Sequence, residues 1–108
     1  MIVVEESHNQ VILRLPTEFN FKLHQEFRKC YQHRPSGLTY IIDFQDVTCF
    51  DSSALGMLLL LRSHCGDERA DIHLVNCSAH IGRILATARF DSYFHIAATP
   101  FLGWWPGK

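Results

Sequence analysis

An aspartate followed by two serines is the part of this sequence whose residue types could support chemistry. Asp51, Ser52 and Ser53 follow a hydrophobic stretch and open a run that favours a helix. The first turn of a helix leaves backbone N–H groups without partners and is the positive end of the helix dipole. A phosphate on a hydroxyl there would be stabilised by those donors. Taken alone, however, these residue types favour simple capping of the helix, because serine and aspartate are common cap residues.

A second chemistry for this segment is nucleophilic catalysis by Ser52 or Ser53, with one of the seven histidines as base. No Gly-x-Ser-x-Gly sequence is present, and the histidine nearest the serines along the chain, His64, belongs to the far end of the predicted helix. A catalytic triad is defined by geometry, and nothing in the sequence supports one here. We therefore predict no catalytic residues and a protein that is not an enzyme.

The cysteines and histidines give little indication of a metal site. Cys77 with His80, and His64 with Cys65, are the candidate ligand pairs, but the tight Cys/His doublets typical of structural zinc sites are missing among the four cysteines. Buried cysteines commonly act as small hydrophobic residues. The sequence therefore predicts free thiols, no metal and no cofactor.

Composition and charge narrow the class of protein. The length of 108 residues fits one domain, and a hydrophobic content of 47% is enough for a core. A net charge of −1 argues against a nucleic-acid partner. The N-terminus lacks the basic segment of a signal peptide, and the longest apolar run, residues 57–61, is far shorter than the roughly 20 residues that cross a bilayer. We expect a cytoplasmic protein with no membrane partner.

The elements that must position the serines alternate between strands and helices. Helices are expected to begin after Asn20, near Asp51 and after Ser78, and strands are predicted at residues 2–4, 10–15, 38–44, 71–76 and 94–97. The stretch 38–44 is apolar on both alternating sets of positions, which is typical of a strand covered on both faces. The order ββαβαβαβ predicts an α/β fold, with helices packed against a mixed β-sheet.

The chain is predicted to consist of one domain and a short C-terminal tail. Residues 1–98 form one domain, with residues 5–9 as a turn between the first two strands. Residues 99–108 form a Trp/Pro/Gly-rich C-terminal tail that contains Trp104 and Trp105. Either the tail folds back over the core, or it makes a self-association or partner contact.

The helix after the serines is apolar around almost its whole circumference. Between Ala54 and Leu61 only Gly56 interrupts the apolar residues. A helix on one side of a sheet needs a single apolar stripe. Another element must cover its outer side, or that side binds a partner. We expect the partner interface to include whichever of Met57, Leu58 and Leu61 is exposed to solvent.

The stretch from Tyr40 to Gly56 resembles the signature of STAS domains, and particularly that of single-domain anti-sigma-factor antagonists. In that family a hydrophobic strand leads through D-x-(T/S)-x-x-D-S-S-(G/A)-L-G into a helix, and the likeness extends from about residue 2 to residue 97. The resemblance implies the STAS fold and a partner-switching function.

The same resemblance implies a phosphorylation site and two kinds of partner. A serine-kinase anti-sigma factor with a histidine-kinase-like ATPase fold phosphorylates the first serine of the motif, here Ser52. The unphosphorylated antagonist binds the anti-sigma factor and a sigma factor is released; phosphorylation ends binding, and a PP2C-type phosphatase resets the switch. The partner-binding residues implied are Asp51, Ser53, Ala54, Leu55, Gly56, Met57 and Asn20.

Two departures from the family pattern concern the partner. Ala54 replaces the commoner glycine, and residues 17–20 replace Gly-x-hydrophobic-Asp, so that Asn20 lacks the usual negative charge. The alternative function is a non-switching STAS scaffold or a transporter-associated subunit, which would need no acceptor serine. The sequence does not distinguish a monomer from a weak dimer.

Overall fold

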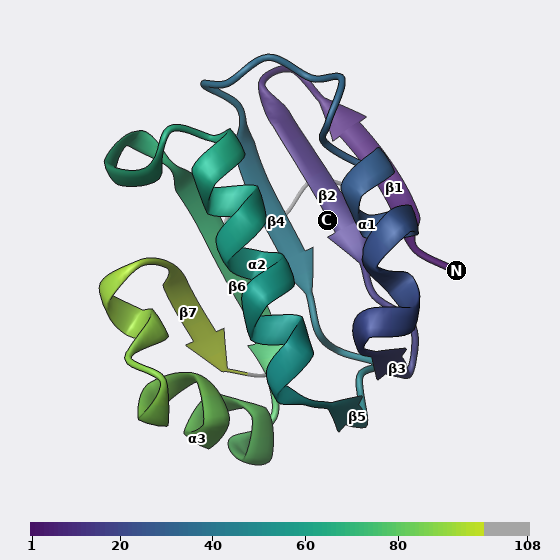
Figure 1. Ribbon diagram of the computed structural model, residues 1–108, viewed down its shortest axis with the longest axis vertical. Coiled ribbons are helices and arrows are strands. Elements are labelled where there is room, and N and C mark those ends of the chain that lie inside the picture. The colour runs from purple at the N-terminus through teal and green to yellow at the C-terminus, as the bar shows by residue number, and fades with distance from the viewer. Residues whose placement is uncertain (99–108) are drawn as a thin grey trace.

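The computed structural model describes residues 1–98, which fold around a five-stranded sheet of order β1-β2-β4-β6-β7 (Figure 1). β1 and β2 are antiparallel, and the other neighbouring pairs are parallel. The mixed sheet and the order ββαβαβαβ are confirmed. The strands are β1 (Val3–Ser7), β2 (Gln10–Arg14), β4 (Thr39–Asp43), β6 (Asp71–Cys77) and β7 (His95–Ala98).

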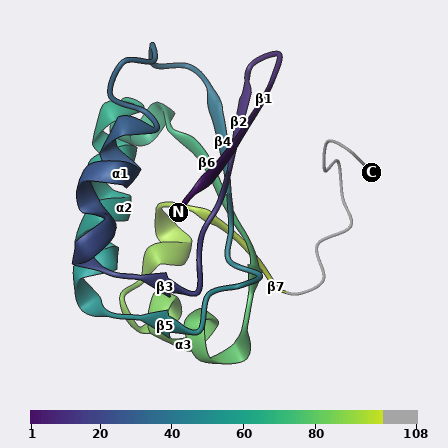
Figure 2. The ribbon, with the colours of Figure 1, turned by 90° about the vertical axis from the view of Figure 1, so that its right-hand side faces the viewer.

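Three α-helices cover one face of the sheet: α1 (His24–Lys29), α2 (Ser52–His64) and α3 (Ala79–Thr87) (Figure 2). Short 3₁₀ helices occur at residues 21–23, 67–69 and 90–92. Asp51 caps α2 and Ser78 caps α3, as the sequence predicts. Asn20 caps the 3₁₀ turn that leads into α1. None of the helices in residues 1–98 is long and apolar enough to span a membrane.

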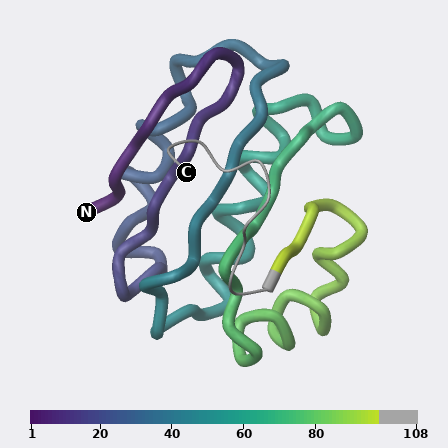
Figure 3. The backbone as a smooth tube through the Cα atoms, turned by 180° about the vertical axis from the view of Figure 1, so that it is seen from behind, coloured from purple at the N-terminus to yellow at the C-terminus, as the bar shows by residue number. Residues whose placement is uncertain are grey.

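β4 is buried on both faces, as its apolar residues on both alternating sets of positions predict. Tyr40 and Ile42 belong to the main core under the helices, whereas Ile41 joins Ile12 and Val75 in a smaller apolar cluster on the other face. Seen from behind, the strands lie in front of the helices (Figure 3). Trp104 and Trp105 lie outside the described residues, so both predictions for the tail stay predictions.

The first hairpin corrects the predicted turn. The sequence assigns residues 5–9 to a turn, but β1 continues to Ser7, with Glu5 opposite Ile12 and Glu6 opposite Val11. β1 is an edge strand whose residues are all exposed, so polar side chains fit it without a burial cost. The turn is therefore confined to His8, which has a φ of 50°, and its neighbour Asn9.

The surroundings of α2 also differ from the prediction. Met57, Leu58 and Leu61 are 4%, 0% and 0% exposed, so the expectation that one of them is exposed in a partner interface is wrong. α2 lies over the middle of the sheet, with α1 along one flank and α3 near its first turns on the other (Figure 1). Because neighbours surround most of the helix, its apolar residues mainly serve the domain's own core. Leu59 and Leu60 remain 40% and 63% exposed.

Candidate functional site

Asp51 organises the start of α2. Its backbone is extended, and its carboxylate Oδ1 accepts hydrogen bonds from the backbone N–H of Ser53 at 3.1 Å and of Ala54 at 3.4 Å. The same oxygen accepts a hydrogen bond from the Ser53 hydroxyl at 2.5 Å. Two of the free N–H groups of the first turn are thus satisfied by an anionic cap, which the helix dipole also favours.

These hydrogen bonds stabilise the negative charge of the Asp51 carboxylate. The Ser53 hydroxyl, with smaller contributions from the backbone N–H groups, lowers the pKa of the Asp51 carboxyl below its usual value. The carboxyl is ionised at neutral pH even at its ordinary pKa, and the lowered pKa keeps it ionised at more acidic pH as well. The exposed start of α2 therefore carries a negative charge of its own, beside Ser52.

The two serines of the motif are in different states. The Ser53 hydroxyl is half-buried and donates to Asp51. Ser52 is exposed, and none of residues 1–98 forms a hydrogen bond with its hydroxyl. The nearby Thr48 hydroxyl donates weakly to the backbone carbonyl of Thr17, at 3.4 Å. Ser52 is thus the hydroxyl in this segment that the fold leaves accessible and unused.

A small second sheet brings the loop before α1 next to this site. β3 (Glu18–Phe19) pairs in parallel with β5 (Cys49–Phe50), and the backbone N–H groups of Thr48 and Cys49 both donate to the carbonyl of Thr17. The sequence analysis did not foresee these two-residue strands. Through them a shallow hollow forms whose lining joins Asp51 to the start of α1: Asn20, Phe21, Lys22, His24 and Asp51.

An apolar groove runs from this hollow between α1 and α2, with a volume of about 490 Å³. Gly56 is part of its wall, and a Cβ built there would meet no heavy atom within 4 Å. Phe21 and Leu60 expose 61% and 63% of their surface at its rim. The whole lining is Phe21, His24, Phe27, Arg28, Tyr31, Ser53, Gly56, Met57 and Leu60. We call this surface the α1–α2 groove.

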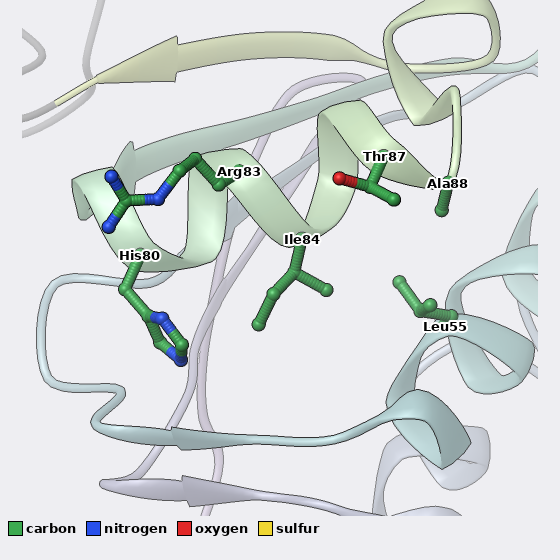
Figure 4. A pocket seen from close by; sticks show the side chains of 6 residues that line it. All are labelled: Leu55, His80, Arg83, Ile84, Thr87 and Ala88. Atoms are coloured by element: carbon green, nitrogen blue, oxygen red, sulfur yellow. The ribbon is translucent and has the colours of Figure 1, made fainter.

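A second groove lies on the other flank of α2 (Figure 4). Leu55 of α2 faces Ile84 and Ala88 across it, and His80 and Arg83 extend from the first part of α3. This groove is wide open, and Arg83 gives its lining a positive charge. The start of α2 therefore lies between two apolar depressions, one on each flank.

The predicted partner-binding residues divide by exposure. Asp51 and Gly56 are exposed, and Asn20, Ser53 and Leu55 are half-buried. Ala54 and Met57 are 0% and 4% exposed, so the Ala54 side chain is not available to a partner and Met57 offers only the small part that lines the α1–α2 groove. Ala54 instead contributes its backbone N–H group, which donates a hydrogen bond to the Asp51 carboxylate.

Phe21 and Leu60 are the surface residues of the groove that sequence reasoning missed. Phe21 is apolar and directly follows the cap residue Asn20, yet its ring stacks on His24 at 4.1 Å outside the core. Leu60 belongs to a run of leucines whose buried and exposed members look alike in sequence. Only the positions of α1 and the sheet distinguish them.

The serine triad and the Cys77–His80 metal pair considered from the sequence find no support in residues 1–98. His64 Nε2 lies 2.8 Å from the carbonyl oxygen of Arg34, and no histidine within these residues hydrogen-bonds to Ser52 or Ser53. All four cysteines are free, as predicted. Cys77 is buried with its thiol near the Leu74 carbonyl, and burial raises its pKa to about 12, so it is poorly suited to bind a metal with His80.

Sequence comparison identifies the family. A family model of the STAS domain matches residues 1–100. This chain belongs to the STAS domain family. It is 42% identical over 89 residues to a STAS-domain containing protein of Pseudomonas aeruginosa (strain UCBPP-PA14), an alignment that covers 82% of this chain and 88% of that relative.

Solved structures resemble this STAS domain in fold. An anti-sigma-factor antagonist (STAS) domain protein from Planctomyces limnophilus superimposes with a TM-score of 0.77 at 16% identity, covering 91% of this chain and 90% of the other. The unphosphorylated form of the anti-sigma factor antagonist SpoIIAA gives a TM-score of 0.73 at 18% identity, covering 92% of this chain and 90% of the other. The phosphorylated form of SpoIIAA from Bacillus gives a TM-score of 0.65 at 17% identity, covering 92% of this chain and 93% of the other.

Proposed function

We propose that this STAS domain is an anti-sigma-factor antagonist of a partner-switching system. In its unphosphorylated form it binds a kinase-type anti-sigma factor of the histidine-kinase-like ATPase fold, so that a sigma factor is released. Phosphorylation of Ser52 ends this binding, and a PP2C-type phosphatase restores it. We place this function in the cytoplasm. Membership of the STAS family and the fold shared with anti-sigma-factor antagonists support the proposed function.

The observation that carries the proposal is the contrast between the two serines. Ser53 holds the cap together through Asp51, so that modifying its hydroxyl would remove a hydrogen bond of the folded state. Ser52 is exposed at the first position of α2. It can enter a kinase active site without disturbing the cap.

Charge explains how the phosphate would act. It adds about −1.5 to −2 charges beside the ionised Asp51, whose carboxylate already accepts from two N–H groups of the first turn. The phosphate therefore gains less from the helix start than it would at an uncapped one. Its larger effect is on the complex, where a dianion would be desolvated against the apolar surfaces that flank the site. A loss of about 3 kcal/mol would weaken binding more than a hundredfold.

The partner surface proposed is the exposed start of α2 together with the α1–α2 groove. Asp51, Ser52 and Gly56 are exposed at the start of α2. Phe21 and Leu60 provide apolar contacts at the rim of the α1–α2 groove. Asn20 belongs to the adjoining hollow, where the family usually has an aspartate. We expect this change of charge to select a partner whose facing surface is less basic.

Phosphorylation by candidate kinases tests the proposal. The purified domain is incubated with Mg-ATP and each histidine-kinase-like ATPase of the same genome, and the modified residue is located by mass spectrometry. We expect phosphate on Ser52, no phosphate in Ser52→Ala, and normal phosphorylation at Ser52 in the control Ser53→Ala. Phosphate on Ser53 or Thr48 would contradict the assignment.

A binding measurement separates the switch from the alternative function. Ser52→Ala should bind the anti-sigma partner and stay bound in the presence of ATP, and its stability should change by less than about 0.5 kcal/mol because its hydroxyl makes no described hydrogen bond. A protein that no kinase modifies, and whose partner binds Ser52→Asp and wild type equally, would be a non-switching scaffold or transporter-associated subunit instead.

A further inference from the structure

Asp71, His73 and His95 meet on the face of the sheet opposite the helices, and their potential ligand atoms all lie within 4.8 Å of one another. Asp71 and His73 are two residues apart on β6, so both point to the same face. His95 is the parallel-register neighbour of His73 on β7. We propose that these three residues bind a divalent transition-metal ion of the Zn²⁺ type, which cross-links β6 and the edge strand β7.

The distances suit such an ion. Asp71 Oδ1 lies 2.8 Å from His73 Nε2, a hydrogen bond that the ion would replace, and 3.5 Å from His95 Nε2. Zinc binds imidazole nitrogen and carboxylate oxygen at about 2.0–2.2 Å, which places neighbouring tetrahedral ligand atoms about 3.3 Å apart. The two observed separations lie on either side of this value. All three ligand atoms can therefore reach one ion after small side-chain rotations.

One rearrangement is required. The His73 and His95 rings are stacked, with centroids 4.4 Å apart and an interplanar angle of 22°, so their nitrogen lone pairs lie in two nearly parallel planes. Binding must turn one ring until the lone pairs converge. The His95 side chain is 67% exposed and has room to rotate, whereas that of His73 is 20% exposed. His95 is therefore the ligand that moves.

The carboxylate is held in position by a neighbour. The Thr39 hydroxyl on β4 donates to Asp71 Oδ2 at 2.8 Å, which leaves Oδ1 directed at the two histidines. Thr39 and Asp71 are register partners, so the sheet itself sets this hydrogen bond. An outer hydrogen bond of this kind commonly orients a metal ligand, and its removal costs about 10–100-fold in affinity.

The choice of ion follows from the ligand types. Two imidazoles and one carboxylate favour zinc, copper or nickel over magnesium or calcium, which prefer oxygen ligands. Three protein ligands leave a tetrahedral ion one position for water or for a group of another molecule. The site is at the N-terminal end of β6, whereas Ser52 follows the C-terminal end of the parallel strand β4. The metal site and the proposed switch are thus at opposite ends of the sheet, and either can be tested without the other.

Zinc titration of the tag-free, chelator-stripped chain tests the inference. Isothermal calorimetry with ZnCl₂ should show one equivalent bound, and His95→Ala should weaken binding at least tenfold. Thr39→Val should weaken it about tenfold. At zinc concentrations about a hundred times the dissociation constant, the melting temperature of wild type should rise by about 10 °C or more, and that of His95→Ala should not.

Matched controls exclude other zinc ligands. His80→Ala removes an exposed histidine of α3, and Cys49→Ser removes the exposed thiol; both should bind zinc like wild type. In wild type itself, zinc should shift the side-chain ¹⁵N resonances of His73 and His95 and leave those of His80 in place, which avoids any dependence on the folding of a variant. Wild type without stoichiometric binding, equal binding by His95→Ala, or a loss in His80→Ala would each overturn the site.

Discussion

Two strand-to-helix junctions of this domain are built alike but leave different groups exposed. β5 leads to the cap Asp51 and helix α2, and β6 leads to the cap Ser78 and helix α3. At α3 the serine is the cap itself, with its hydroxyl accepting from the Ile81 N–H at 3.2 Å, and Ala79 takes the first helical position. At α2 an aspartate does the capping, and the first helical position holds Ser52.

The comparison of the two helix starts shows that the Ser52 hydroxyl is not needed to cap α2. One capping side chain satisfies the helix start at α3, and nothing further is added. At α2 the capping set is Asp51 and Ser53, so that the Ser52 hydroxyl has no part in it. Each helix also carries a glycine in its first half, Gly56 or Gly82, where an added Cβ would meet no heavy atom within 4 Å. Space in the monomer therefore does not require glycine at either position.

The largest expected effect is that of charge at the first helical position. Ser52→Asp should weaken binding of the anti-sigma partner more than a hundredfold, since about 3 kcal/mol of desolvation and repulsion corresponds to that factor. The matched change Ala79→Asp puts the same charge at the first position of α3 and should leave binding unchanged. Surface plasmon resonance with the partner immobilised measures both.

The structure of the Ser52→Asp variant sharpens this test. Because the cap does not use Ser52, backbone NMR shifts should change only near residues 50–56. Shift changes that reach α3 would show that the switch acts through a change of conformation.

The two glycines provide the next comparison. Gly56→Ala and Gly82→Ala should each raise the free energy of unfolding by about 0.5–1 kcal/mol, because alanine has less backbone entropy to lose in a helix. If a partner lies closely over the start of α2, Gly56→Ala alone should also weaken binding, by about tenfold or about 1.4 kcal/mol.

Urea unfolding and partner titration of the two glycine variants give both quantities. A Gly56→Ala variant that is stabilised and binds like wild type would remove Gly56 from the interface. A Gly82→Ala variant that binds weakly would extend the interface to α3.

Loss of the caps themselves should change stability by about as much as the glycine variants do, in the opposite direction. Ser78→Ala removes one acceptor for a backbone N–H and should cost about 1 kcal/mol of stability. Asp51→Ala removes the acceptor of two N–H groups and of the Ser53 hydroxyl, so its melting temperature should fall further. Thermal unfolding followed by circular dichroism compares the pair, and a smaller loss at Asp51 would mean that water replaces its carboxylate.

The smallest effect is the pH dependence of the α2 cap. The folded-state pKa of Asp51 is lowered, so its contribution is fully present above the unfolded pKa of about 3.9 and is lost as the pH falls below it through the folded value. Asp51→Asn keeps the capping oxygen without the charge. The stability difference between wild type and Asp51→Asn in urea should therefore be constant from pH 7 to about pH 5 and shrink below pH 4. Ser78→Ala and wild type should show no such change in their difference.

Much of the fold and of the α2 site could be predicted from local sequence. The capped starts of α2 and α3, the doubly buried strand β4 and the exposed position of Ser52 depend on nearby residues, on cap chemistry and on apolar spacing. The expectation that an exposed member of Met57, Leu58 and Leu61 belongs to the partner interface was wrong, because all three are buried. A helix that is apolar on most sides does not show which side its neighbours will cover.

The sequence by itself determined the order of the five main strands and the three helices, the caps of α2 and α3 and the motif that relates the chain to STAS domains. Only the tertiary structure decided which residues meet across those elements: Thr17 against Thr48, Phe21 beside the α1–α2 groove, and Asp71 with His73 and His95. These contacts depend on the register of parallel strands separated by long crossovers. The burial of one face of each strand restricts this register, but which residues of two distant strands become neighbours is fixed only when the whole sheet packs against its helices.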